Sequence, residues 1–161
     1  MRKFIVSLLG VFVFCLLVVL ARQAKSQDTN SGPAVQVRVH YTGTGTVDEN
    51  HKIYVVLWDS PDFVEGKAMP VELKPTTSKN GTVTFSDVKK LPAYVSVAFD
   101  PNGGWDGKSG PPPEGSSLGL YSKEPGKPEP INVAASKQTT IEVLFDDTVK
   151  MHSGEPSRSH P

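Results

Sequence analysis

Residues 52–59 read KIYVVLWD, and this stretch decides the fold class. From Ile53 to Trp58 the apolar side chains fall at both odd and even positions. A short strand with two apolar faces is buried on both sides, so we expect it at the centre of a sheet. The sequence on either side must then supply the neighbouring strands and a second layer for the core.

Outward from this stretch, apolar and polar residues alternate in several short runs, and no run after the first 26 residues has the period of a helix. Period two with one apolar face is typical of a half-buried strand. The runs expected to be strands are 35–41, 71–73, 81–85, 94–100, 131–133 and 140–146. With residues 52–59 they predict an all-β chain that folds as a seven-stranded, two-sheet antiparallel sandwich of immunoglobulin-like type.

The beginning of the chain has the pattern of an export signal. Arg2 and Lys3 precede an uncharged apolar run over residues 4–21, and the small residues Ala24 and Ser26 follow it. This pattern predicts a signal peptide that is cut after Ser26, which places the mature protein in the periplasm or outside the cell. The run is also just long enough to cross a bilayer, so an uncleaved N-terminal anchor is the alternative.

Composition divides the remaining chain. Residues 101–130 hold 7 of the 14 glycines and 7 of the 14 prolines, whereas the last residues are polar and rich in serine. Long loops in compact domains are often functional. We therefore expect a signal peptide at 1–26, a linker at 27–32, a β-sandwich domain at 33–148 with a long Gly/Pro loop at 101–130, and a disordered tail at 149–161.

Charge and cysteine content exclude several classes of function. Without residues 1–26 the chain has 17 − 4 = 13 basic residues against 17 acidic ones, a formal charge of −4. This balance argues against nucleic-acid binding, which needs clustered Lys and Arg. The single cysteine is Cys15, inside the predicted signal, so disulfides and thiolate sites are excluded from the mature chain.

The head of the long loop is a candidate cation site. Together with Gly104, Asp100, Asn102 and Asp106 occupy every second position of this glycine-rich stretch, and Glu114 follows later in the loop. Calcium prefers several oxygen ligands on a tightly turning backbone. The alternative is that Asp and Asn side chains cap turns of their own backbone. The sequence thus predicts no cofactor other than Ca²⁺, and it leaves the choice between cation and turn open.

Four aromatic residues form a candidate ligand-binding set. Tyr54 and Trp58 share one face of the central strand, and Trp105 and Tyr121 lie in the long loop. Exposed aromatics can stack on sugar rings or hold a partner protein. Alternatively, the two strand residues pack beneath the long loop.

Catalysis ranks last among the functions considered. Residues 115–119 read GSSLG, which matches the Gly-x-Ser-x-Gly pattern around Ser117. A nucleophile elbow needs a strand-to-helix turn, but a triple proline precedes this match and no helix follows it. We therefore expect a protein that is not an enzyme, with a hydrolase as the least favoured alternative.

Two segments resemble a known group of sandwiches. Residues 81–88, GTVTFSDV, and 92–99, PAYVSVAF, are similar to a run found in transthyretin-like and carboxypeptidase-regulatory-like domains. Residues 100–107, DPNGGWDG, resemble a stretch in bacterial secreted domains of unknown function, although Gly104 stands where that pattern has Asn. The resemblance covers about residues 33–147. It implies a prealbumin-type sandwich outside the cytoplasm, and it implies that edge strands could form a homo-oligomer.

Together these observations predict an exported, non-catalytic binding or structural module. The expected ligand is a polysaccharide or a protein of the cell envelope, met through the long loop and its aromatics. The alternative is an accessory domain stabilised by calcium. Membrane contact is expected only if the N-terminal segment stays uncleaved.

Overall fold

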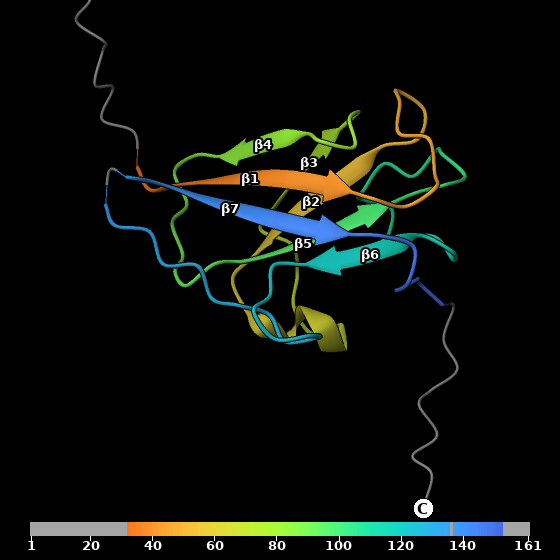
Figure 1. Ribbon diagram of the computed structural model, residues 1–161. Coiled ribbons are helices and arrows are strands. Elements are labelled where there is room, and N and C mark those ends of the chain that lie inside the picture. Colours follow the sequence, from red (N-terminus) through yellow and green to blue (C-terminus); the bar gives the residue numbers. More distant parts are fainter. Residues whose placement is uncertain (1–31, 136, 153–161) are drawn as a thin grey trace, which may run out of the picture. The chain divides into compact units, whose positions relative to one another are not determined.

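The computed structural model describes residues 32–135 and 137–152. The predicted signal peptide, most of the linker and residues 153–161 lie outside the described residues. Two sheets carry the fold (Figure 1). Strands β4 (Thr82–Phe85), β1 (Ala34–Tyr41) and β7 (Gln138–Phe145) form the first sheet, in that order. The second has the order β3 (Glu72–Thr76), β2 (Ile53–Trp58), β5 (Tyr94–Phe99) and β6 (Ser117–Leu120).

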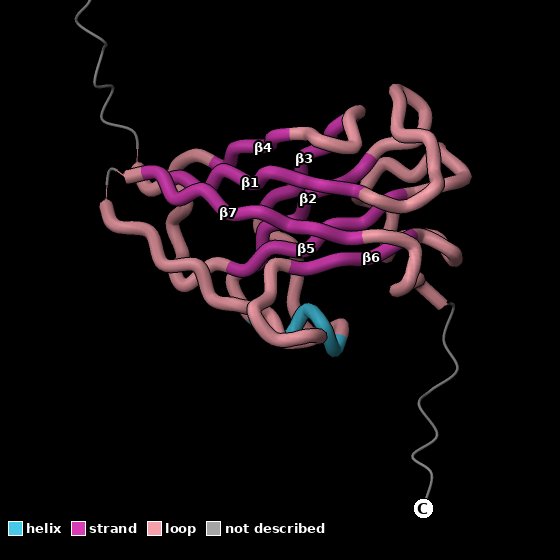
Figure 2. The backbone as a smooth tube through the Cα atoms, in the orientation of Figure 1, coloured by secondary structure: helices cyan, strands magenta, loops and turns pink. Residues whose placement is uncertain are grey.

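The predicted all-β class with two sheets and seven strands is confirmed. Within the described residues the only helical element is a single 3-10 helix, η1 (Pro61–Glu65), visible as the one cyan segment of Figure 2. Ser60 caps it, because its hydroxyl accepts a hydrogen bond from the N–H of Asp62. No helix of this part of the chain is long and apolar enough to span a membrane.

The core lies between the two sheets and consists of the apolar side chains that the predicted period-two patterns place on one face of each strand. Val35, Val37 and Val39 of β1 face Val95 and Val97 of β5, all of them almost fully buried. Full burial of such a side chain contributes about 1.5–3 kcal/mol. The central position expected for residues 53–58 is also confirmed, since β2 pairs with β3 on one side and β5 on the other.

The expectation of a wholly antiparallel sandwich is wrong at one place. β1 and β7 pair in parallel over all eight of their residues, from Ala34 opposite Gln138 to Tyr41 opposite Phe145. Parallel neighbours need a long crossover connection rather than a hairpin. The five intervening strands supply that connection, because β1 and β7 are the first and last strands of the chain.

One expected strand is replaced by another. Ile131 makes only an isolated bridge with Ala93, and no strand forms at 131–133, although Ile131 and Val133 are both buried. Instead β6 forms inside residues 101–130, which the sequence predicts to be loop, and it pairs with β5. A Cβ on Gly119 would lie 2.5 Å from the Cβ of Phe145, so glycine lets β6 approach β7 closely.

The outer faces of the two sheets differ in polarity. The three-stranded sheet exposes polar residues, among them Arg38 and Glu142, whose side chains form an ion pair at 3.6 Å. The four-stranded sheet instead carries Tyr54 and Val56 on its outer face, and both are buried. Residues that follow β5 cover this second face.

Candidate functional site

Asp100 starts the segment that covers the four-stranded sheet. Its side chain is almost fully buried, at 1% exposure. One carboxylate oxygen accepts a hydrogen bond from the N–H of Asn102 at 3.0 Å, and the other accepts one from the N–H of Trp105 at 3.1 Å. This geometry is that of an aspartate that shapes a turn of its own backbone.

Asp106 is engaged in the same way. Its Oδ1 accepts hydrogen bonds from the N–H groups of Lys108 and Ser109, both at 2.7 Å, and its Oδ2 accepts one from the Ser109 hydroxyl. These bonds, led by the one from the Lys108 N–H, hold the pKa of the Asp106 carboxyl below its ordinary value. The carboxylate oxygens that a cation would use therefore already accept hydrogen bonds from the protein.

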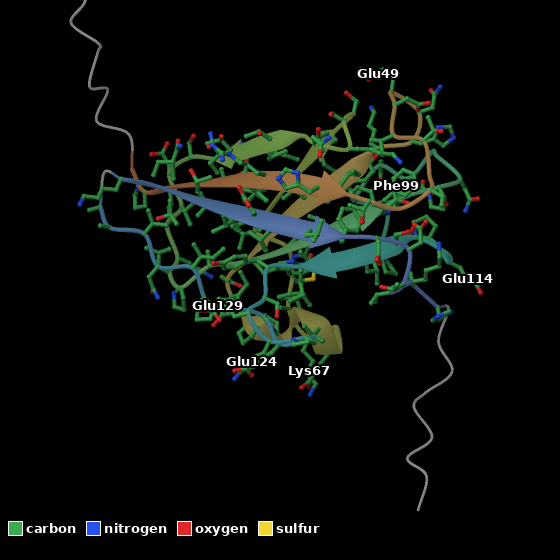
Figure 3. All side chains as sticks on the ribbon, in the orientation of Figure 1. Glu49, Lys67, Phe99, Glu114, Glu124 and Glu129 are labelled. Carbon is green, nitrogen blue, oxygen red and sulfur yellow. The ribbon has the colours of Figure 1, made fainter. Side chains whose placement is uncertain are left out.

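The other two predicted cation ligands are exposed. Asn102 lies on the surface, and Glu114 points outward at the end of the domain (Figure 3). Among residues 32–135 and 137–152, no three His, Cys, Asp or Glu side chains are grouped as a metal would need. The structure does place the charges of Asp100 and Asp106 near Tyr54. Burial is the main cause that raises the pKa of the Tyr54 hydroxyl, and these two negative charges raise it further.

Tyr54 and Trp105 form a packed pair. Their ring centroids are 4.7 Å apart with the planes at 66°, an edge-to-face contact, and the Tyr54 hydroxyl donates a hydrogen bond to the Trp105 carbonyl. The indole Nε1 of Trp105 is buried and has no hydrogen-bond partner among the described residues. A Cβ on Gly107, whose φ is +75°, would lie 2.6 Å from Leu73. The chain thus lies directly on the sheet here.

The remaining two aromatics make separate internal contacts. The Trp58 indole stacks on Phe63 of η1 at 4.9 Å, and its Nε1 donates a hydrogen bond to the Ser96 hydroxyl at 2.9 Å. Tyr121 is partly buried and packs against the core. The four aromatics proposed for ligand binding therefore do not form one exposed surface in this structure.

A polar cluster around Asp147, which the sequence analysis misses, joins three parts of the fold. Asp147 Oδ1 accepts hydrogen bonds from the hydroxyls of Tyr41 at the end of β1 and Ser117 in β6. Its Oδ2 accepts bonds from the N–H and hydroxyl of Thr44 at 2.8 and 3.0 Å. The Tyr41 hydroxyl, followed by the Thr44 N–H, holds the pKa of Asp147 far below its ordinary value. Burial raises the pKa of Tyr41, and the bond to Asp147 raises it further.

The chain beyond Asp147 runs along the outer edge of β6. The Leu118 N–H donates to the Val149 carbonyl, the Met151 N–H donates to the Ser116 carbonyl, and the Gly115 N–H donates to the Met151 carbonyl, each at 2.8 Å. We call residues 149–151 the C-terminal strap. The sequence assigns these residues to the tail, whereas here they are paired with β6.

Two other sheet edges, those of β3 and β4, are protected as well. Edge strand β3 contains Pro75, which lacks an N–H group, and Lys74, whose core-facing side chain lies 5.2 Å from the Phe85 ring centroid. The Lys74 ammonium also donates a hydrogen bond to the Thr84 carbonyl of edge strand β4 at 2.7 Å. Proline and inward-facing charge are common devices that stop edge strands from pairing with other chains.

The fourth edge, that of β7, is open. The carbonyls of Lys137 and Phe145 accept bonds from β1, so the odd-numbered residues direct their backbone groups toward β1. Since backbone groups alternate along a strand, Gln138, Thr140, Glu142 and Leu144 direct theirs away from the sheet. No backbone hydrogen bond reaches these groups from any described residue. Leu144 is 70% exposed.

A groove lies beside the start of β3. It has a volume of about 570 Å³, and its lining includes Met69 and Val71, which are 82% and 52% exposed. The lining also includes Lys89 and Lys90, and Lys90 forms an ion pair with Asp59. In this ion pair the Lys90 ammonium donates a hydrogen bond to the Asp59 carboxylate, and that bond lowers the pKa of Asp59.

Comparison with known proteins found no matching family model, curated protein or solved structure. The resemblance to transthyretin-like sandwiches therefore stays a prediction. The function has to be argued from this chain's own residues, and the open edge of β7 is the feature of the described residues that most directly offers an interaction surface.

Proposed function

We propose that the protein is an exported, non-catalytic binding module that takes an extended segment of an envelope protein onto the edge of β7. The open edge carries this proposal. An added strand gains main-chain hydrogen bonds along its length, which is a common mode of peptide recognition. β7 offers eight residues for such pairing, without a proline or a bulge.

The contrast among the four edges supports this function. An open edge invites aggregation, and natural sheets usually block it. In this fold Pro75 and Lys74 block β3, Lys74 caps the Thr84 carbonyl of β4, and the C-terminal strap covers β6. Protection of three edges and not of the fourth is what we expect when the fourth has a partner.

A polysaccharide is the less supported ligand. Sugar binding needs aromatic faces that are open to solvent. Tyr54 is only 7% exposed, and Trp58 is stacked by Phe63. Binding to a glycan array by wild type and not by the Trp105→Ala variant would support the polysaccharide instead.

Photo-crosslinking tests the proposal in cells that export the full chain. A benzophenone amino acid replaces Leu144 at the edge of β7, and in a control it replaces Val71 in the groove. We expect an adduct with another protein from position 144 only, which is lost with Thr140→Pro and kept with Thr140→Ala. Proline removes the outward N–H at 140 while the bonds to β1 remain.

Two results would overturn the proposal. One is an adduct at position 144 that persists with Thr140→Pro in a variant that still folds. The other is an adduct that contains only a second copy of this chain, because the edge would then serve self-association.

A further inference from the structure

The outer face of β7 has a defined chemistry at the open edge. Glu142 and Leu144 are exposed, lie two residues apart, and therefore point to the same side of the sheet. Arg38 on β1 forms an ion pair with Glu142 at 3.6 Å, on the side away from the open edge. An added strand would approach Glu142 from the opposite side.

The residues of an added strand that lie opposite Glu142 and Leu144 then determine which partner sequence is favoured. Residues directly opposite each other on one face interact, and opposite charges or paired apolar side chains stabilise the pair. A basic residue is favoured opposite Glu142, and an aliphatic residue is favoured opposite the exposed Leu144. In an antiparallel strand, the residue opposite Leu144 precedes the one opposite Glu142 by two positions.

A second copy of β7 cannot meet these requirements. β7 reads QTTIEVLF and contains neither Lys nor Arg. In antiparallel self-pairing, Glu142 therefore faces Gln138, Thr140, another Glu142 or Leu144, according to the register. No register of self-pairing places a basic residue opposite Glu142 on the side of the open edge.

We infer that β7 recognises an antiparallel segment of another protein that reads aliphatic–any residue–basic, with the basic side chain opposite Glu142 and the aliphatic one opposite Leu144. This inference rests on the proposed function, and it adds the chemistry of the partner. The groove beside β3 plays no part in it.

Fluorescence anisotropy with two synthetic peptides tests the inference. The first is fluorescein-labelled Ser-Leu-Val-Lys-Val-Thr-Ser-amide, in which Leu and Lys are placed to face Leu144 and Glu142. The second has Glu in place of Lys. We expect the wild-type full chain to bind the Lys peptide about fivefold more tightly than the Glu peptide. The Glu142→Lys variant should reverse this order, and Thr140→Pro should abolish binding of both peptides.

The outcomes separate the inference from the proposed function. If Thr140→Pro abolishes binding but Glu142→Lys leaves the order unchanged, strand addition stands and the partner chemistry is wrong. The inference is overturned if both peptides bind Thr140→Pro and wild type with equal affinity. It is also overturned if the peptides bind neither protein at millimolar concentration. If wild type sediments as a dimer and Thr140→Pro as a monomer, a second copy occupies the edge and both proposals fail.

Discussion

Asp147 illustrates how one side chain can join separate parts of a sandwich. Its two carboxylate oxygens accept hydrogen bonds from Tyr41, Thr44 and Ser117, which come from β1, the following loop and β6. The chain turns at this residue from the three-stranded sheet to the edge of the four-stranded sheet. Hydrogen bonds to charged groups contribute about 1.5–3 kcal/mol each, and an unpaired partner costs more than the bond alone.

We predict that Asp147→Asn lowers the free energy of unfolding by about 1–3 kcal/mol at pH 7. The folded-state pKa of Asp147 is depressed, so its contribution is present above the unfolded value of about 3.9 and is lost as the pH falls below that value. Urea unfolding between pH 7 and pH 2 should therefore show a steeper acid loss for wild type than for the variant. Asp146→Asn is the matched control: within the described part of the chain Asp146 accepts hydrogen bonds only from the neighbouring Thr148, which also lower its pKa, so this variant should change the acid slope less than Asp147→Asn. Equal acid slopes for wild type and Asp147→Asn would contradict this role.

Asp100 and Asp106 give a prediction about calcium. The oxygens of both carboxylates accept hydrogen bonds from nearby N–H and hydroxyl groups, so we expect 5 mM Ca²⁺ and a chelator to leave the melting midpoint unchanged. A site with a Kd one hundredth of that concentration would add about 2.7 kcal/mol. A rise in the midpoint that Asp100→Ala removes would show that the loop binds the cation after all.

At the scale of elements, the C-terminal strap is the least expected feature. Three backbone hydrogen bonds join residues 149–151 to Gly115, Ser116 and Leu118. The stretch reads Val149-Lys150-Met151, which is too short to predict a strand by itself, so its order comes from pairing with β6 rather than from local preference. The strap in turn gives β6 a neighbour on each side.

Truncation tests this mutual support. We expect a chain that ends at Thr148 to lose about 1.5–4.5 kcal/mol of unfolding free energy, from three bonds at about 0.5–1.5 kcal/mol each. The uncovered β6 edge should also promote self-association. A chain that ends at His152 keeps the strap and serves as the control. Chemical denaturation and sedimentation velocity measure the two effects, and identical behaviour of the two truncations would show that the strap adds nothing.

The strands that the sequence predicts correctly are those with a strong period-two pattern or two apolar faces. Val35–Tyr41 and Ile53–Trp58 are examples, because burial on one or both faces shows directly in the sequence. β6 is missed because it has four residues, one of them Gly119, and depends on β5 and the strap. Ile131 and Val133 are buried as their spacing suggests, yet Pro130 precedes them and only Ile131 forms a bridge.

The candidate site was less accessible from sequence for a related reason. The sequence identifies Tyr54 and Trp105 as notable, and it allows that Tyr54 lies beneath the loop, but the contact between them needs the fold. Whether β7 is an edge or a central strand depends on which strands pair, and no local pattern reveals that. Asp147 carries no motif at all, since the residues that donate hydrogen bonds to it lie 30 to 106 residues away in the sequence.

At the scale of the whole molecule, the two sheets have different tasks. The four-stranded sheet is covered on its outer face by the segment after β5, and it anchors the strap. The three-stranded sheet keeps an outer face that is polar apart from Leu144, and it ends in the open edge of β7. The binding module that we propose needs one stable body and one accessible surface, and this division is consistent with that proposal.

Export is predicted from the N-terminal sequence and can be measured by intact mass. We expect the mature protein to begin at Gln27 and to be recovered from the periplasm or the medium. An uncut chain of 17.4 kDa in the membrane fraction would show instead that the N-terminal segment is an anchor.

Native-state hydrogen exchange of β7, resolved by residue, tests the central claim most directly. The account predicts that the N–H groups of Thr139, Ile141 and Val143, which face β1, exchange slowly, and that those of Thr140, Glu142 and Leu144 exchange fast until a partner strand is added. Equal protection of both sets in the free protein would mean that the edge of β7 is already covered, and this result would contradict the account.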